Sequence, residues 1–174
     1  QPNGPYVAIL ALMFPQTPAS SSAFPERHAI SRARLFLELA DPLPGEQCNL
    51  HEAYLEAAII FARTAIQRLA TSYRKSPGWG PWFEDLKVNS SVAFIRDERN
   101  SILKEAAPKI GQVGFALAVS GPGTETSPPP LPPAKSHYYY ESNTTPAIDT
   151  VRRHLDEIER LVIEGEMKFG TRGR

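Results

Sequence analysis

The sequence predicts a mostly α-helical bundle with a small antiparallel β-hairpin before the last helix. Of the 17 prolines, seven lie at or before Pro44 and six lie between Pro122 and Pro133. Proline cannot continue a helix, so the stretches between these groups are the ones free to be helical. They carry apolar residues at helical spacing over wide faces. Two β-prone runs, 112–120 and 137–142, flank the second proline group and predict the hairpin.

Composition limits the size and class of the protein. The 174 residues suit one ordinary domain, and the 41% of hydrophobic residues suffice for one packed core. Lys plus Arg and Asp plus Glu number 19 each, so there is no overall charge to attract nucleic acid or an anionic membrane, which leaves only a local patch. Cys48 is the single cysteine, which excludes an intramolecular disulfide and a cysteine-based zinc site.

Residues 1–25 are expected to form an N-terminal arm. The apolar run from Val7 to Phe14 has eight residues, well short of the roughly 20 that span a membrane. A secretory signal requires a Lys or Arg before its apolar run, and none precedes this run. We interpret the arm as an apolar segment that packs on the domain or on a partner, the alternative being a remnant of a targeting signal. We therefore expect a soluble, cytoplasmic protein without membrane contact.

A single helical domain is expected over residues 26–166. Its first helix spans Ile30 to Leu39 and ends at Asp41-Pro42, because the residue before a proline disfavours helix. A turn over residues 76–81 precedes a short helical piece over 82–86.

The best-defined helix runs from Leu50 to about Tyr73. Asn49 is its expected N-cap, and Glu52 stands where a capping-box carboxylate reaches back. This helix is apolar over most of its circumference, which predicts a central position and surface left for a second copy of the chain. Its narrow polar stripe, interpreted as a solvated seam, consists of Glu52, Glu56, Arg63 and Gln67.

Ser90 or Ser91 is expected to cap the next helix, which ends near Ala106. Arg99 lies near the middle of its apolar face, formed by Val92, Ile95, Ile102, Leu103 and Ala106. A guanidinium in such a place needs a carboxylate or a phosphate, because an unpaired buried charge is costly. Two interpretations stay open: Arg99 pairs with Glu52 or Glu56 or extends past its neighbours to water, or it belongs to a functional site with Arg96 beside it.

The remaining segments complete the bundle. Residues 121–135 read as a proline-rich exposed loop, with an SH3-type or WW-type ligand as the less favoured interpretation. The tyrosines at 138–140 suit cross-strand pairing, with base stacking as the alternative. Thr145 is the expected N-cap and Pro146 the first residue of a helix that ends near Glu164, followed by a basic tail over 167–174.

Familiar catalytic motifs are missing from the sequence. It has no glycine-rich phosphate loop and no Gly-x-Ser-x-Gly elbow. His51-Glu52 opens like a metalloprotease helix, but Leu55 occupies the place of the second histidine. The Cys48 and His51 pair is read as incidental, and the four histidines show no ligand spacing. We expect no metal and no cofactor.

The helix around Arg99 resembles a known signature. The segment Phe94-Ile-Arg-Asp-Glu-Arg-Asn-Ser-Ile-Leu-Lys-Glu105 is similar to the late-helix motif of HEPN domains, in which four to six residues, often beginning with Asn, separate an Arg from a His. The segment from Phe61 to Leu69 adds to the likeness, which covers about residues 47–109 and a final helix. The resemblance implies a usually dimeric helical bundle of prokaryotic toxin–antitoxin or antiviral systems, often a metal-independent ribonuclease.

In this chain Lys104 stands where the family has His. The resemblance implies that Arg99, Asn100 and Lys104 form the catalytic site, with Arg96, Glu52 and Glu56 in support. A free lysine has a pKa of about 10.4, so it holds a phosphate more readily than it accepts a proton from a ribose hydroxyl. We therefore expect a homodimeric module that binds RNA, a nucleotide or a partner protein with little or no catalysis. The alternative is an active endoribonuclease.

Overall fold

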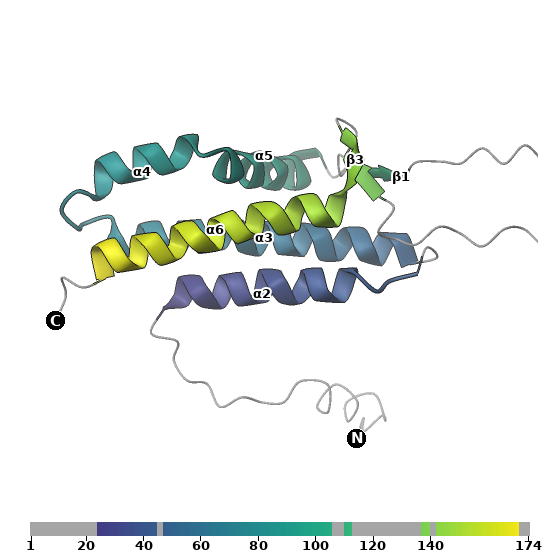
Figure 1. The fold of residues 1–174 in the computed structure, drawn as a ribbon, viewed down its shortest axis with the longest axis horizontal. Coiled ribbons are helices and arrows are strands. Elements are labelled where there is room, and N and C mark those ends of the chain that lie inside the picture. Colours follow the sequence, from purple (N-terminus) through teal and green to yellow (C-terminus); the bar gives the residue numbers. More distant parts are fainter. Residues whose placement is uncertain (1–23, 45–46, 106–109, 113–136, 140–141, 171–174) are drawn as a thin grey trace, which may run out of the picture.

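The structure, a computed structural model, describes residues 24–44, 47–105, 110–112, 137–139 and 142–170. These residues form a mostly helical bundle with a small antiparallel sheet before the last helix, which confirms the predicted fold class (Figure 1). None of the described helices is both long and apolar enough to cross a membrane.

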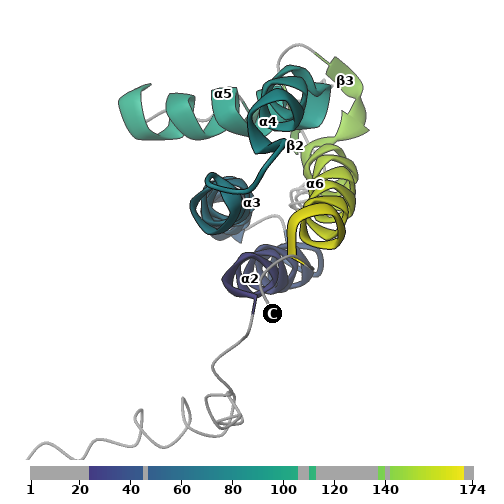
Figure 2. The ribbon, with the colours of Figure 1, turned by 90° about the vertical axis from the view of Figure 1, so that its left-hand side faces the viewer.

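Three long helices run side by side along the molecule. They are α2 (Pro25–Ala40), α3 (Cys48–Tyr73) and α6 (Ala147–Phe169). Helix α2 is antiparallel to both of the others, as Figure 1 shows. Helices α4 (Trp79–Val88) and α5 (Ser90–Glu105) follow α3 in the chain. Helix α5 crosses α3 at a large angle: Figure 2 shows α5 from the side and the three long helices nearly end-on.

Helix α3 is central, as its apolar circumference predicts. It packs against α2, α5 and α6. Its inward face is fully buried and consists of Leu55, Ala58, Ile59, Ala62, Ala65, Ile66 and Leu69. Partners from α6 include Val151, Leu155 and Ile158, which are also fully buried.

A ladder of ion pairs joins α2 to α6. Arg27 Nε donates to Glu166 Oε2 (2.6 Å), and Arg34 Nε donates to Glu159 Oε2 (3.0 Å). At the far end the charges exchange helices, and Arg152 lies 3.6 Å from Asp41. Successive rungs are seven residues apart on both helices, about two turns, so they recur on one side of the antiparallel pair. We call these contacts the ion-pair ladder.

Three predicted helix caps are wrong, and one of them is at α6, where Pro146 and not Thr145 is the N-cap. The N-cap of α3 is Gln47 and makes no side-chain cap hydrogen bond; Asn49 lies inside the helix, and its Oδ1 accepts from the Cys48 thiol (3.6 Å). Helix α5 is capped by Asn89, one residue before the predicted serines. Its Oδ1 accepts from the backbone N–H groups of Ser91 (2.9 Å) and Val92 (3.3 Å). Asn89 has an extended backbone (ψ 132°), which leaves its side chain free to reach those orphan donors.

Two helices begin earlier than predicted. Helix α2 starts at Pro25, whose missing N–H costs nothing in the first turn. Helix α4 starts at Trp79, because Gly78 (φ 80°) turns the chain in the left-handed region before it. The earlier start stacks Trp79 on Phe83 and brings it within 5.2 Å of Trp82, ring centre to ring centre.

Helix α6 is longer than predicted and closely packed at its end. It begins at Ala147 with Pro146 as N-cap and continues to Phe169, which is buried against Trp79 and Trp82. A Cβ at Gly165 would lie 3.0 Å from the Trp82 ring, so this position needs glycine for the close approach of α4.

The described sheet has three short strands. They are β1 (Ile110–Gln112), β2 (His137–Tyr139) and β3 (Ser142–Pro146), antiparallel in the order β1-β2-β3. Of the predicted pairing between residues 112–120 and 137–142, the described residues show Gln112 opposite His137, while residues 113–120 lie outside them. Strand β1 begins two residues before the predicted strand, and β3 is an addition that the sequence analysis missed. The N-terminal arm over 1–23, residues 113–136 with the loop, and the tail over 171–174 lie outside the described residues.

Candidate functional site

Arg99 lies half-buried on α5, beside the buried Ile95. Its Nη1 donates to Asn100 Oδ1 (3.3 Å). Within the described residues, neither Glu52 nor Glu56 forms an ion pair with Arg99, so the carboxylate pairing that the sequence left open is not found. The cause is the course of α5 across α3, which brings Arg99 into the electrostatic reach of Arg63 instead.

Three arginines gather where α5 crosses α3. Arg63 of α3 is half-buried, and burial lowers the pKa of its guanidinium, with smaller contributions from the positive charges of Arg99 and Arg96. Arg96 Nε donates to the adjacent Asp97 (2.8 Å). Arg63 has no ion pair among the described residues. We call Arg63, Arg96 and Arg99 the arginine cluster; like charges held together in this way suit an anion supplied from outside the chain.

The two other predicted site residues follow Arg99 on α5. Asn100 is half-buried and accepts from Arg99. Lys104 is exposed in the last turn, where a cation interacts favourably with the helix dipole. Its exposed ammonium group is accessible to a phosphate. The described geometry thus joins Arg99 and Asn100 directly and places Lys104 about one turn further along.

The predicted supporting glutamates lie on α3, both half-buried. Burial raises the pKa of the Glu56 carboxyl, and the negative charge of Glu52 adds to the rise. We call Glu52 and Glu56 the acidic pair. Glu56 precedes Arg63 by seven residues, so both project from the same flank of α3.

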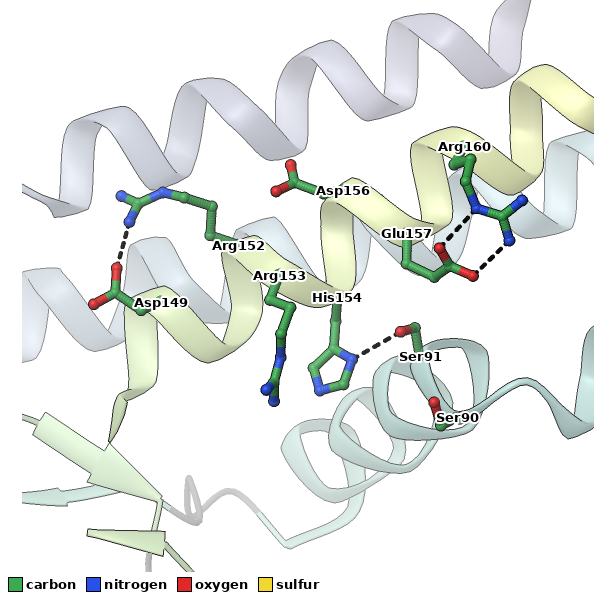
Figure 3. A pocket seen from close by; sticks show the side chains of 9 residues that line it. All are labelled: Ser90, Ser91, Asp149, Arg152, Arg153, His154, Asp156, Glu157 and Arg160. Atoms are coloured by element: carbon green, nitrogen blue, oxygen red, sulfur yellow. Dashed lines mark hydrogen bonds and ion pairs between the residues drawn. The ribbon is translucent and has the colours of Figure 1, made fainter. Parts of the chain in front are cut away.

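A groove of about 870 Å³ lies on the other side of α5, between its first turn and α6 (Figure 3). His154 stacks on Phe94 with ring centres 4.0 Å apart, and its Nδ1 is 2.9 Å from Ser91 Oγ. Burial lowers the pKa of His154, with a smaller effect from Arg153, so the ring is neutral near pH 7. This contact attaches α6 to the start of α5.

Most charges that line this groove are already paired. Asp149 binds Arg152, Asp156 binds Arg34, and Glu157 accepts from Arg160 and from Asn89. Arg153 is exposed, and among the described residues it has no ion pair. A single exposed cation beside paired charges describes a solvated helix face, and the groove is not a preformed site.

Two weaker sequence candidates have structural roles. His51 is fully buried, and its Nδ1 donates to the carbonyl oxygen of Ala40 (2.9 Å), which fixes α3 to the end of α2. Because that ring is engaged there and the Cys48 thiol contacts Asn49, the pair gives no thiolate site. Within the described ranges, no three His, Cys, Asp or Glu side chains are grouped to hold a metal ion.

Sequence reasoning missed Arg63, which it assigned to a solvated stripe, and the contact of His154 with Ser91. The clue to Arg63 was its position on the flank of a helix that is otherwise apolar. Comparison of the chain with family models, with curated proteins and with solved structures found no match.

Proposed function

We propose that this chain is a HEPN-like, homodimeric helical module that binds the phosphates of RNA or a nucleotide, with little or no catalysis. The observation that carries the proposal is the arginine cluster, in which Arg99 lacks any carboxylate partner among the described residues. Arginine forks match phosphate oxygens, and each phosphate contact also releases counterions from RNA. The resemblance in the Arg99 region extends the proposal to a prokaryotic defence or toxin–antitoxin system.

The site residues take separate roles in this proposal. Arg99 and Arg96 hold a phosphate, Asn100 orients Arg99 through its amide oxygen, and exposed Lys104 contacts the next phosphate. Arg63 lies next to these arginines on α3, and Glu52 and Glu56 lie further along the same helix. Zero net charge confines RNA attraction to this patch, so binding should be moderate and strongly dependent on salt.

Fluorescence anisotropy with a labelled single-stranded RNA tests the proposal. We expect Arg99→Gln to weaken binding about tenfold or more, since one charge-assisted contact to phosphate is lost. The matched control is Arg160→Gln, whose guanidinium is paired with Glu157 and Glu164 within α6, and it should bind like the wild type. Equal binding by both variants, or none by the wild type, contradicts the proposal.

The alternative function is a metal-independent endoribonuclease that uses Arg99, Asn100 and Lys104. Exposure of Lys104 argues against a proton-accepting role. A cleavage assay in the presence of a chelator decides between the two. Cleavage that disappears in both Arg99→Ala and Lys104→Ala supports the nuclease, and RNA binding without cleavage supports the binding module.

A further inference from the structure

An acidic group and a basic group occupy one flank of α3. The acidic pair lies towards its start, and Arg63 lies seven residues after Glu56, at the arginine cluster. Seven residues make about two turns, or about 10.5 Å along the axis, so the two groups are separate but face the same way. Neither Glu56 nor Arg63 has an ion pair within the described parts of the chain.

Both groups are unfavourable within a single chain. Burial and Glu52 disfavour the charge on Glu56, and burial, Arg99 and Arg96 disfavour the charge on Arg63. Half-buried charges of this kind are costly unless an opposite charge reaches them. Among the described residues, Glu56 therefore has no cation and Arg63 has no carboxylate, and the two side chains are too far apart on one helix to pair with each other.

The surface between the groups suits another helix. Ala53 is exposed, and Ala57 and Ile60 are half-buried on the outer stripe of α3. Small side chains permit close helix approach, and Ile60 has apolar surface left to bury. In Figure 2, no helix of the described residues covers α3 on the side away from α6.

We infer that a second copy of this chain packs its α3 antiparallel to this α3, across a two-fold axis near Ile60. Glu56 of each copy then faces Arg63 of the partner subunit. An isologous contact repeats every pairing twice, so one acidic group and one basic group per chain satisfy both copies. The inference rests on the proposed function only for the dimeric state.

The molecule already uses this register in its own fold. In the ion-pair ladder, Arg27 with Glu166 and Arg34 with Glu159 recur every seven residues along an antiparallel helix pair. Glu56 and Arg63 have the same seven-residue spacing on α3, so an antiparallel copy of α3 can form two ion pairs with them. Neutralising Arg63 in this way leaves Arg96 and Arg99 directed towards a phosphate.

Charge exchange tests the interface. Molar mass is measured by light scattering and by sedimentation for the full chain, for Glu56→Arg, for Arg63→Glu and for the double variant. The wild type should be a dimer at micromolar concentration, and each single change should raise the dissociation constant about tenfold or more, because two pairs become repulsive. The double variant restores opposite charges across the axis and should return to within about threefold of the wild type.

Two controls make the result specific. Glu38→Arg reverses an exposed glutamate on α2 and should leave the dimer intact. Circular dichroism checks that each variant is folded, and Glu56→Gln and Arg63→Gln give milder versions with the same expected direction.

Several results would overturn the inference. They are a monomeric wild type at about 100 μM, a dimer unaffected by Glu56→Arg, or a double variant as dissociated as the single ones. RNA that binds a monomer through Arg63 would assign the cluster to nucleic acid alone. Because Arg99→Gln reports RNA binding and Glu56→Arg reports assembly, failure of one proposal is distinguishable from failure of the other.

Discussion

The contact between α2 and α6 and the contact between α3 and α5 use arginine in opposite ways. Along α2 and α6, Arg27, Arg34 and Arg152 each meet a carboxylate of the facing helix. Where α5 crosses α3, Arg63 and Arg99 meet each other instead. Antiparallel helices keep two matched patterns in register along their length, whereas two crossing helices do not repeat one register along their contact.

The difference teaches that the contribution of an arginine to the stability of the fold depends on the charge of the group that it faces. The ion-pair ladder holds two helices of one chain together. Among the described residues, the arginine cluster adds repulsion between Arg63 and its two neighbours on α5, which the proposed phosphate would relieve. The four predictions below test this contrast.

The largest expected effect is in the ladder. Arg27→Met leaves the carboxylate of Glu166, which is 5% exposed, without its cation and close to Glu26. Loss of one member of a fully buried pair costs 3–5 kcal/mol, and we expect about 2 kcal/mol because Arg27 itself is half exposed. Thermal unfolding at pH 7 measures the loss. Arg160→Met, which removes only exposed pairs within α6, should remain near the wild type.

Glu26 is the exception within the ladder region and should give the next largest effect. Burial raises the pKa of its carboxyl, and the negative charge of Glu166 contributes less. A raised pKa in the folded state means stability that is present at acid pH and lost as pH rises through that pKa. Glu26→Gln should therefore raise the melting temperature at pH 8 and change it little at pH 4. An equal decrease in the melting temperature at both pH values would mean that the hydrogen bond between Glu26 and Tyr73 dominates.

The arginine cluster should respond with the opposite sign. Arg99→Gln removes a repulsive charge and no ion pair, so the free energy of unfolding without ligand should stay constant or rise by about 0.5 kcal/mol. Chemical denaturation measures this change. A loss above about 1 kcal/mol would reveal a carboxylate partner and end the contrast.

The smallest effect is in the salt dependence. Raising NaCl from about 50 mM to about 500 mM shortens the screening length from roughly 14 Å to roughly 4 Å. The destabilisation by Arg34→Met and the gain from Arg99→Gln should then both shrink, each by a few tenths of a kcal/mol. Parallel shifts of the same sign in the two variants would contradict the assignment of attraction to one contact and repulsion to the other.

Local patterns predicted the helices well. The apolar periodicity of residues 50–73 was sufficient to place α3 at the centre, because burial follows from which residues share a face. The helix caps were harder to predict. Asn89, Ser90 and Ser91 are all residue types suited to an N-cap, and the backbone angle that favours Asn89 cannot be read from the sequence. The register of the ladder was present in the sequence, but reading it requires knowing that α2 and α6 are antiparallel neighbours.

The candidate site was predictable only in part. Arg99 and Asn100 stood out because they interrupt an apolar face, and the structure brings them into contact. The pairing of Arg99 with Glu52 or Glu56, one of the interpretations left open, is not found among the described residues, because the crossing of α5 over α3 depends on tertiary packing. Arg63 was overlooked for the same reason, since a polar stripe on one helix does not reveal which charges a second helix adds.

The only two tryptophans of the chain stand next to each other on α4, and both pack against Phe169 at the end of α6. Intrinsic fluorescence of this protein is therefore an optical reporter of a single corner, while far-ultraviolet circular dichroism averages over all helices. If α4 separates from Gly165 before the long helices part, the emission curve will precede the ellipticity curve during denaturation. Coincident curves will show instead that this corner melts together with the rest.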